Sequence, residues 1–88
     1  MNTRVVHWRQ EPCDVRIDRG SIWGNPFRIG PHGTRYQVIE KYRAWIKLQP
    51  ALMARLPELQ GKVLGCWCKP SACHGDVLAE LADATLRR

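Results

Sequence analysis

One stretch in the first half of the chain is too rich in glycine and proline to form a helix or a strand. It runs from Arg19 to Gly33, and its breakers are Gly20, Gly24, Pro26, Gly30, Pro31 and Gly33. Glycine raises the entropy cost of ordering the backbone and proline removes a hydrogen-bond donor, so this density of both prevents a regular element. We therefore predict a long structured loop here.

Two short segments before this loop have the composition of strands. Residues Arg4 to Trp8 are rich in β-branched and aromatic side chains, and the pattern breaks at Pro12. From Asp14 to Asp18 the apolar residues Val15 and Ile17 alternate with polar ones, which is the period of a half-buried strand. We predict a strand in each segment.

The segment after the loop predicts two helices. Thr34 and Gln37 have the spacing of a capping box, in which the threonine hydroxyl accepts the third amide and the glutamine reaches back. Pro50 suits the first turn of a second short helix, which Pro57 is expected to end. The first helix has an apolar stripe at offsets of three and four, made of Val38, Ile39, Tyr42, Trp45 and Ile46.

The last third of the chain predicts a strand and then a helix. The strand is expected from Lys62 to Cys68, with Cys66 and Cys68 on one face. Trp67 falls on the opposite face, where we expect it to pack beneath a helix. The final helix is predicted from about Cys73 to Leu86, because its apolar residues recur at helical spacing.

The predicted order of elements is β-β-α-α-β-α. Strands that alternate with helices indicate the α/β class, here a small sheet of about three strands with helices packed on it. At 88 residues the chain is long enough for a single domain, residues 1–88. In such folds the loop between a strand and the following helix is the usual ligand position, so we expect the functional site there.

Basic side chains outnumber acidic ones. The chain has 14 lysines and arginines against 8 aspartates and glutamates, a formal net charge of +6, which favours nucleotides or nucleic acid as partners. No apolar run approaches the ~20 residues that cross a bilayer, and the first ten residues lack the pattern of a secretory signal. We therefore expect a cytoplasmic protein with no membrane partner and with reduced cysteines.

The strongest chemical signal is a cluster of cysteines and one histidine, Cys66-Trp-Cys-Lys-Pro-Ser-Ala-Cys-His74. One hypothesis is a zinc site, since four soft ligands are available in Cys66, Cys68, Cys73 and His74. The spacing differs from the usual C-x2-C knuckle, and adjacent residues on a helix diverge by about 100°. Cys73 and His74 would therefore have to bind the metal before the helix becomes regular.

A second hypothesis places a reactive thiolate or a bound anion at the start of the last helix. Unpaired amides and the helix dipole lower the pKa of a thiol there and also attract phosphate. Cys73 would then be the catalytic nucleophile and His74 a base or a cationic clamp. Asp76 would orient His74, and Lys69 would add ligand-binding charge at the rim.

The third interpretation of the cluster is structural. Free cysteine is often a small buried hydrophobe, and His74 can simply donate to a backbone carbonyl. Cys13 lies far from the cluster in sequence and is assigned a structural role.

The loop from Arg19 to Phe27 combines glycines, a tryptophan, an amide side chain and flanking arginines. Such a loop brings backbone amides close to a phosphate, while the indole offers a stacking face and the amide reads a base edge. The candidate ligand-binding residues are Arg19, Gly20, Ser21, Trp23, Gly24 and Asn25. Alternatively, Gly24 and Pro26 fix a turn while Trp23 and Phe27 fill the core, since no standard phosphate-binding motif is present.

Three segments together resemble a known family: Arg19-Gly-Ser-Ile-Trp-Gly-Asn-Pro-Phe27, Tyr42 to Trp45, and Gly65-Cys-Trp-Cys-Lys-Pro-Ser-Ala-Cys-His-Gly-Asp-Val-Leu78. The family is the small phage and bacterial one catalogued as domain of unknown function 4326, and the resemblance extends from Val5 to about Leu81. It implies a compact α/β domain in which the loops around Trp23 and around the cysteine cluster converge on one site.

The leading hypothesis is a small basic domain that binds a nucleotide or a nucleic-acid phosphate between these two loops, with the cysteines holding zinc or supplying a thiolate. The alternative is a non-catalytic phage or bacterial accessory protein that sequesters a ligand or docks on a host protein, with a structural cluster. A third hypothesis is generic nucleic-acid binding, which predicts an affinity that falls steeply with salt.

Overall fold

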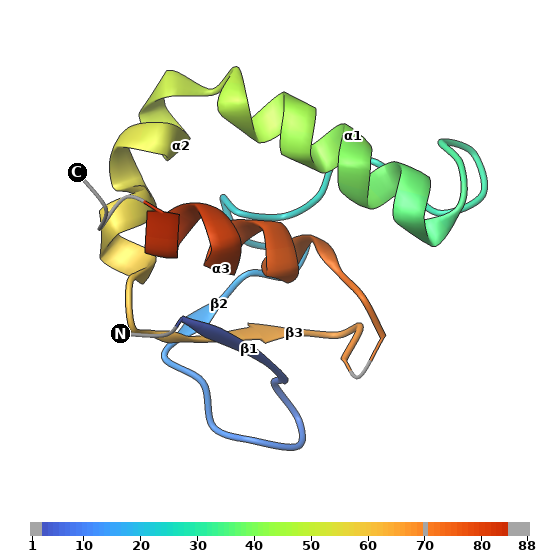
Figure 1. Ribbon diagram of the computed structural model, residues 1–88. Helices are drawn as coiled ribbons and strands as arrows, with labels where there is room; N and C mark the ends of the chain where they lie inside the picture. Colours follow the sequence, from blue (N-terminus) through green and yellow to red (C-terminus); the bar gives the residue numbers. More distant parts are fainter. Residues whose placement is uncertain (1–2, 70, 85–88) are drawn as a thin grey trace.

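Three strands in the described part of the computed structural model, residues 3–69 and 71–84, form one parallel sheet (Figure 1). Because all three strands run in the same direction, their carboxyl ends meet at one edge of the sheet. The middle strand, β3, pairs with β1 on one side and with β2 on the other. The strands are β1 (Arg4–His7), β2 (Val15–Arg16) and β3 (Val63–Cys66).

The strands are shorter than predicted. The chain turns after His7, because the carbonyl of this residue accepts the amides of two residues in the following turn. β3 ends at Cys66, so Trp67 and Cys68 belong to the next loop. The prediction that Cys66 and Cys68 share one strand face is therefore wrong, although the predicted sheet of about three strands is confirmed.

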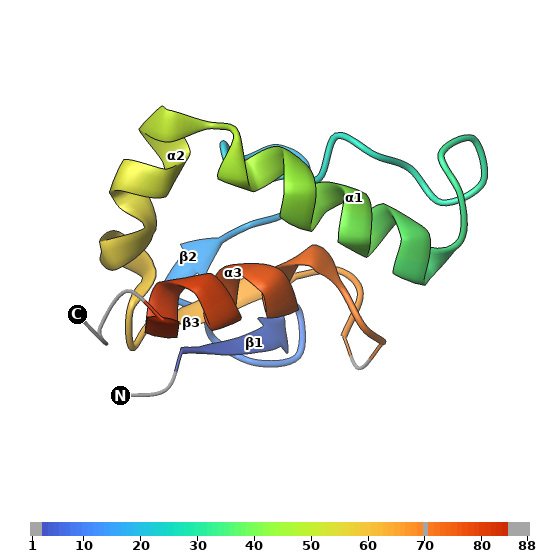
Figure 2. The same ribbon diagram turned by 45° about the horizontal axis from the view of Figure 1, so that its top comes forward.

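The helices gather on one face of the sheet, as Figures 1 and 2 both show. They are α1 (Arg35–Lys47), α2 (Pro50–Arg55), the 3-10 helix η1 (Leu56–Leu59) and α3 (His74–Ala84). α3 packs against β1, β3, α1 and η1, so it lies between the strands and the longest helix. The predicted α/β class and the order β-β-α-α-β-α are confirmed, with η1 added. In the described residues, none of the helices is both long and apolar enough to cross a membrane.

α1 begins where the capping box predicts. The hydroxyl of Thr34 accepts a hydrogen bond from the backbone amide of Gln37 at 3.2 Å. The side-chain oxygen of Gln37 accepts one from the backbone amide of Thr34 at 2.8 Å. These two bonds satisfy amides that the first helical turn leaves unpaired. The predicted apolar stripe faces the core, and its buried members are Val38, Tyr42 and Ile46.

The other helix boundaries differ slightly from the prediction. α2 ends at Arg55, but Pro57 does not stop the helical path, because it lies in the first turn of η1, where a proline lacks only an amide that would be unpaired anyway. α3 begins at His74, one residue after the predicted start. Its predicted end at Leu86 lies outside the described residues.

Gly75 allows α3 to lie close to the strands. A Cβ atom at this position would lie 2.6 Å from Cδ1 of Ile17 and 2.9 Å from Cγ1 of Val5. The first turn of the helix therefore packs its backbone directly on these two side chains. The core that results contains, among others, Ile17, Trp23, Tyr42, Ile46, Leu56, Leu59, Leu64, Val77 and Leu78.

Side chains from the turn between β1 and β2 pack against Gly65 in β3. A Cβ atom at Gly65 would lie 2.5 Å from Sγ of Cys13 and 3.0 Å from Cβ of Trp8. Trp67 lies beside Trp8, with ring centroids 4.9 Å apart, and it is 50% exposed. The prediction that Trp67 packs beneath a helix is wrong, because β3 ends before it and the ring turns toward Trp8.

Replacing Gly65 by alanine is expected to destabilise the fold by about 1–3 kcal/mol, because the added methyl group meets Cys13 and Trp8 in a packed layer. Adding Cys13→Ala removes the nearest atom and should recover part of this loss. Urea unfolding of the single and double variants measures both effects. Gly20→Ala is the matched control, since the nearest atom to a Cβ there is 3.9 Å away. Wild-type stability in Gly65→Ala would contradict this packing.

Candidate functional site

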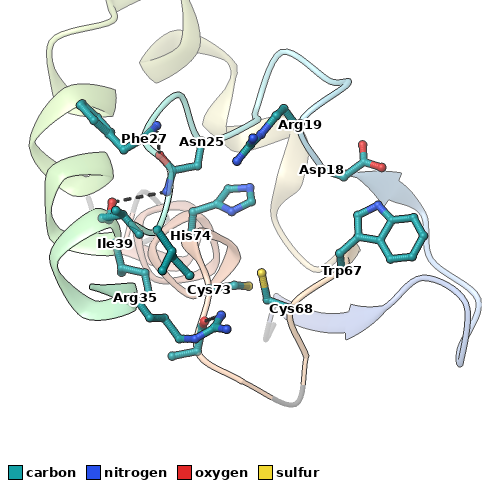
Figure 3. Close-up of a pocket in the computed structure, with 13 residues that line it drawn as sticks. Asp18, Arg19, Asn25, Phe27, Arg35, Ile39, Trp67, Cys68, Cys73 and His74 are labelled. Carbon is teal, nitrogen blue, oxygen red and sulfur yellow. Dashed lines mark hydrogen bonds between the residues drawn. The ribbon is translucent and has the colours of Figure 1, made fainter. Parts of the chain in front are cut away.

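A pocket of about 320 Å³ lies at the carboxyl edge of the sheet (Figure 3). Three segments surround it: the loop after β2, the first half of α1, and the loop that leads from β3 into α3. This is the usual position of ligand sites in parallel sheets. The pocket is lined by Asp18, Arg19, Asn25, Phe27, Ile29, Arg35, Val38, Ile39, Trp67, Cys68, Ala72, Cys73 and His74.

Asn25 holds the glycine-rich loop against α1. Its side-chain nitrogen donates to the carbonyl of Val38 at 3.3 Å, and its side-chain oxygen accepts the amide of Phe27 at 2.9 Å. At Gly24 the loop passes so close to its own start that a Cβ atom would lie 2.8 Å from Cα of Arg19. Gly24 is therefore needed for the chain reversal that brings Arg19 and Phe27 to the same pocket.

Trp23 lies in the core and is 3% exposed. Its carbonyl accepts the hydroxyl of Tyr42 at 2.8 Å. Burial raises the pKa of Tyr42, so this hydroxyl stays protonated and remains a donor. The structure thus gives Trp23 the core-filling role that we considered as the alternative to ligand stacking.

Three cysteine sulfurs gather beside the pocket. Cys66 and Cys73 are buried, with their Sγ atoms 3.3 Å apart, and Cys68 is half-buried. Figure 3 shows the sulfurs of Cys68 and Cys73 pointing toward each other. All three are free thiols. Cys13 lies against Gly65, next to Trp8, and its structural role stays a prediction.

The contacts among these sulfurs separate their pKa values. Hydrogen bonding with Cys73 lowers the pKa of Cys66 to about 6 and the pKa of Cys68 to about 6. Arg35 and Arg19 also lower the pKa of Cys68, because positive charge favours the thiolate. The same hydrogen bonds raise the pKa of Cys73. Cys73 therefore stays protonated, and its single thiol proton can be donated to Cys66 or to Cys68.

His74 connects the start of α3 to the end of β2. Its Nε2 donates to the carbonyl oxygen of Ile17 at 2.6 Å, and its ring packs edge-on against Tyr42 with centroids 5.0 Å apart. Burial lowers the pKa of His74, and the positive charge of Arg19 acts in the same direction. The ring is therefore neutral at pH 7.

Asp76 and Lys69 bind each other at the start of α3. Oδ2 of Asp76 accepts the amide of Cys73 at 3.1 Å, and Oδ1 accepts Nζ of Lys69 at 2.6 Å. We expected Asp76 to orient His74 and Lys69 to add charge at the rim of the site. The structure instead uses Asp76 to cap the helix and pairs it with Lys69.

Arg19 and Arg35 bring positive charge to the pocket from opposite sides (Figure 3). Nη1 of Arg35 donates to the carbonyl of Ala72 at 3.1 Å and so holds the cysteine loop against α1. Arg19 is exposed, and the neighbouring Asp18 is paired with Arg16. Within residues 3–69 and 71–84, neither Arg19 nor Arg35 has a carboxylate at ion-pair distance.

The two predicted loops meet at this pocket, but only part of the predicted site lines it. The predicted residues that line the pocket are Arg19, Asn25, Cys68, Cys73 and His74. Those that lie outside its lining are Gly20, Ser21, Trp23, Gly24, Cys66, Lys69 and Asp76. Several of these shape the surroundings: the hydroxyl of Ser21, for example, donates to the carbonyl of Asp18 at 2.8 Å and closes the turn after β2.

Sequence reasoning missed Arg35. It is the first residue of α1, directly after the cap at Thr34, and this position at the amino end of a helix was the signal that could have identified it. Phe27 was considered only for the core and Trp67 only for packing beneath a helix. Both line the pocket, because the loops that carry them fold over the sheet edge.

The zinc hypothesis stays a prediction. Among residues 3–69 and 71–84, no three His, Cys, Asp or Glu side chains are grouped as metal ligands. Nε2 of His74 is already bonded to Ile17. Zinc binding through His74 would therefore use Nδ1, while the Nε2–H bond to the carbonyl of Ile17 orients the ring.

Stability is expected to fall as the pH is lowered from neutrality through about 6.5, the ordinary histidine pKa. Because burial lowers the folded-state pKa of His74, the unfolded chain takes up a proton first, and unfolding becomes more favourable as the pH approaches the folded-state pKa. His74→Gln should flatten this part of the curve, measured by urea unfolding at several pH values. His32→Gln, which changes an exposed loop histidine, is the matched control. An unchanged slope in His74→Gln would rule out this explanation.

Comparison with known proteins gives matches along most of the chain. The profile of a family described as a domain of unknown function, DUF4326, matches residues 1–84. An uncharacterised 12.4 kDa protein from the nrdA-td intergenic region of Enterobacteria phage T4 is 39% identical over 85 residues, covering 91% of this chain and 77% of that protein.

A second relative comes from another virus. An uncharacterised protein of Acanthamoeba polyphaga mimivirus is 37% identical over 87 residues, covering 78% of this chain and 66% of that protein. No solved structure matches the chain significantly. The family match includes both loops that form the pocket. The chain therefore belongs to the domain family DUF4326.

Proposed function

We propose that this protein binds a nucleoside phosphate in the pocket at the carboxyl edge of its sheet. The observation that carries the proposal is the pair Arg19 and Arg35. These two guanidinium groups lie on opposite sides of a largely apolar pocket, without a carboxylate partner among the described residues. Such a pocket complements a ligand that has an anionic part and an aromatic part.

The phosphate is assigned to the two arginines. The charge of Arg19 already acts on the pocket, since it lowers the pKa of both Cys68 and His74. Arg35 donates to the carbonyl of Ala72 through Nη1 and keeps other donors of its planar fork for a ligand. Both groups favour an anion over a neutral ligand.

The base is assigned to the apolar walls. Phe27 and Ile39 lie on one wall, and Trp67, which is half-exposed, lies on another. An aromatic side chain that stacks on a base contributes about 1–3 kcal/mol and tolerates any base. The side chain of Asn25 is already bonded to α1 and to its own loop, so we assign no base reading to it.

The size of the pocket favours a mononucleotide over a nucleic-acid chain. A volume of about 320 Å³ is at the small end of the range for small-molecule sites, which is about 300–1,000 Å³. The basic residues are also spread along the sequence, with no run that would track a phosphate backbone. We place the protein in the cytoplasm of a bacterial or phage-infected cell, where nucleotides are available and thiols are reduced.

Binding without turnover is the form of this function that the hydrogen bonds favour. His74 donates to Ile17, and Asp76 is occupied by Lys69 and by the amide of Cys73. The Nε2–H of His74 and both carboxylate oxygens of Asp76 are thus engaged in holding the loops in place. The catalytic roles of Cys73, His74 and Asp76 stay predictions.

Isothermal titration with AMP, UMP, adenosine and inorganic phosphate tests the proposal. AMP and UMP are expected to bind, and adenosine should bind at least about tenfold more weakly because it lacks the charge. Arg19→Gln should weaken AMP binding about tenfold or more, since a hydrogen bond to a charged group contributes about 1.5–3 kcal/mol.

Arg55→Gln is the matched control. It removes the same charge at the end of α2, outside the pocket, and should leave the affinity for AMP unchanged. An equal loss in both variants would mean that general charge and not the pocket attracts the ligand. Absence of binding by AMP, UMP and phosphate would overturn the proposal. Tighter binding of a single-stranded oligonucleotide, insensitive to Arg19→Gln, would favour a nucleic-acid surface instead.

A further inference from the structure

We propose that Cys68 and Cys73 form a thiol–disulfide exchange pair that reacts with a small anionic disulfide in the pocket. Nucleotide binding does not use these sulfurs, and no disulfide links them in the structure. The inference concerns a second activity at the same edge of the sheet. Its tests follow the thiols directly and give the same answer whether or not a nucleotide binds.

Cys73 is the sulfur that the other two share. Its Sγ lies 3.3 Å from Sγ of Cys66, and Figure 3 shows the sulfur of Cys68 pointing toward it. A disulfide needs a separation of about 2.05 Å between its sulfurs. The sulfurs of Cys66 and Cys73 are thus in van der Waals contact and Cys68 points toward the same sulfur, so a disulfide requires only a further approach of neighbouring side chains.

Cys68 is the sulfur that a reagent reaches first. It is half-buried and lines the pocket, whereas Cys66 is 1% exposed and lies outside the lining. Arg35 and Cys68 both line the pocket, and positive charge beside a sulfur favours the thiolate, which is the attacking form. Cys73 also lines the pocket but is only 2% exposed, so it suits the second, resolving step.

The geometry of the possible ligands favours this chemistry over metal binding. In the part of the chain that the structure describes, no group of three His, Cys, Asp or Glu side chains is arranged to hold a metal ion. Each of the other two sulfurs lies next to Cys73, and disulfide exchange requires only two neighbouring sulfurs at a time.

The reaction balances in two steps. The thiolate of Cys68 attacks the disulfide RSSR, forms a mixed disulfide Cys68–S–SR and releases RS⁻. Cys73 then gives its proton to the neighbouring Cys66 thiolate and attacks Cys68, which forms the Cys68–Cys73 disulfide and releases a second RS⁻. Two protein sulfurs are oxidised, and RSSR is reduced to two thiols after the released thiolates take protons from water.

Charge selects the class of disulfide. Arg19 and Arg35 flank the pocket that contains Cys68, so a disulfide that carries carboxylates is attracted and a neutral one is not. Glutathione disulfide is such a compound and serves as the probe. Hydroxyethyl disulfide is the neutral counterpart of similar reactivity.

The first experiment treats the reduced protein with glutathione disulfide and maps the products by peptide mass spectrometry. The wild type should form the Cys68–Cys73 disulfide, and Cys73→Ser should accumulate glutathione on Cys68. Cys68→Ser should react at least about tenfold more slowly, because the remaining cluster thiols are buried. Cys13→Ser changes a half-buried cysteine away from the cluster and should react like the wild type. If Cys73→Ser fails to fold, peptide mapping of the wild type and of Cys68→Ser still tests the proposal.

The second experiment compares the two disulfides. Arg19→Gln removes a charge that attracts the anionic disulfide and also favours the Cys68 thiolate, so it should slow the reaction with glutathione disulfide several-fold more than the reaction with hydroxyethyl disulfide, while Arg55→Gln changes neither rate. Modification of Cys13 before Cys68, or a wild-type rate in Cys68→Ser, would overturn the proposal. It is also overturned if elemental analysis finds one zinc ion per chain and Cys66, Cys68 and Cys73 resist both reagents.

Discussion

The parallel pairing of β3 with both of its neighbours is the constraint on which the rest of this structure depends. It brings the carboxyl ends of β2 and β3 to one edge, so the glycine-rich loop and the cysteine loop start side by side. Gly75 then lets α3 lie on the strands, and His74 bonds to the carbonyl of Ile17. The pocket is what remains between these two loops and α1. A change in the pairing of β3 would therefore separate the site residues from one another.

The two pocket arginines and the cysteine thiols lie together at the carboxyl edge of the sheet. Arg35 holds the cysteine loop through the carbonyl of Ala72 and also favours the thiolate of Cys68. Arg19 acts on Cys68 and on His74 from the other side. The same two charges that make the pocket attractive to an anion therefore make its accessible thiol reactive. Ligand binding and thiol exchange are expected to influence each other through these residues.

The features that local sequence specifies were predicted correctly. The capping box at Thr34 and the apolar stripe of α1 depend on residues within a few positions of one another, and the structure contains both. The order of strands and helices follows from the same kind of periodicity. Strand lengths were overestimated, because a turn after His7 and the loop after Cys66 interrupt the pairing and neither turn has a strong local signal.

The parts of the site that depend on long-range packing were harder to predict. Trp23, for which ligand stacking and core filling were both considered, is buried beside Tyr42, whereas Trp67, expected beneath a helix, lines the pocket. Which tryptophan is buried depends on where the loops cross α1, and spacing along the chain does not encode this. Arg35 was missed although its place at the start of α1 is a local signal, because the contact that joins it to the cysteine loop is with Ala72, 37 positions away.

Nucleotide binding in the pocket is tested most directly by a heteronuclear NMR titration of the wild-type protein with AMP and, separately, with inorganic phosphate. If the phosphate binds the arginines and the base binds the apolar walls, backbone amide chemical shifts should change around Arg19, Arg35 and Cys68 with both ligands. Around Phe27 and Trp67 they should change with AMP alone. Shift changes scattered over the basic residues of the whole surface, with none around the pocket, would contradict nucleotide binding in the pocket.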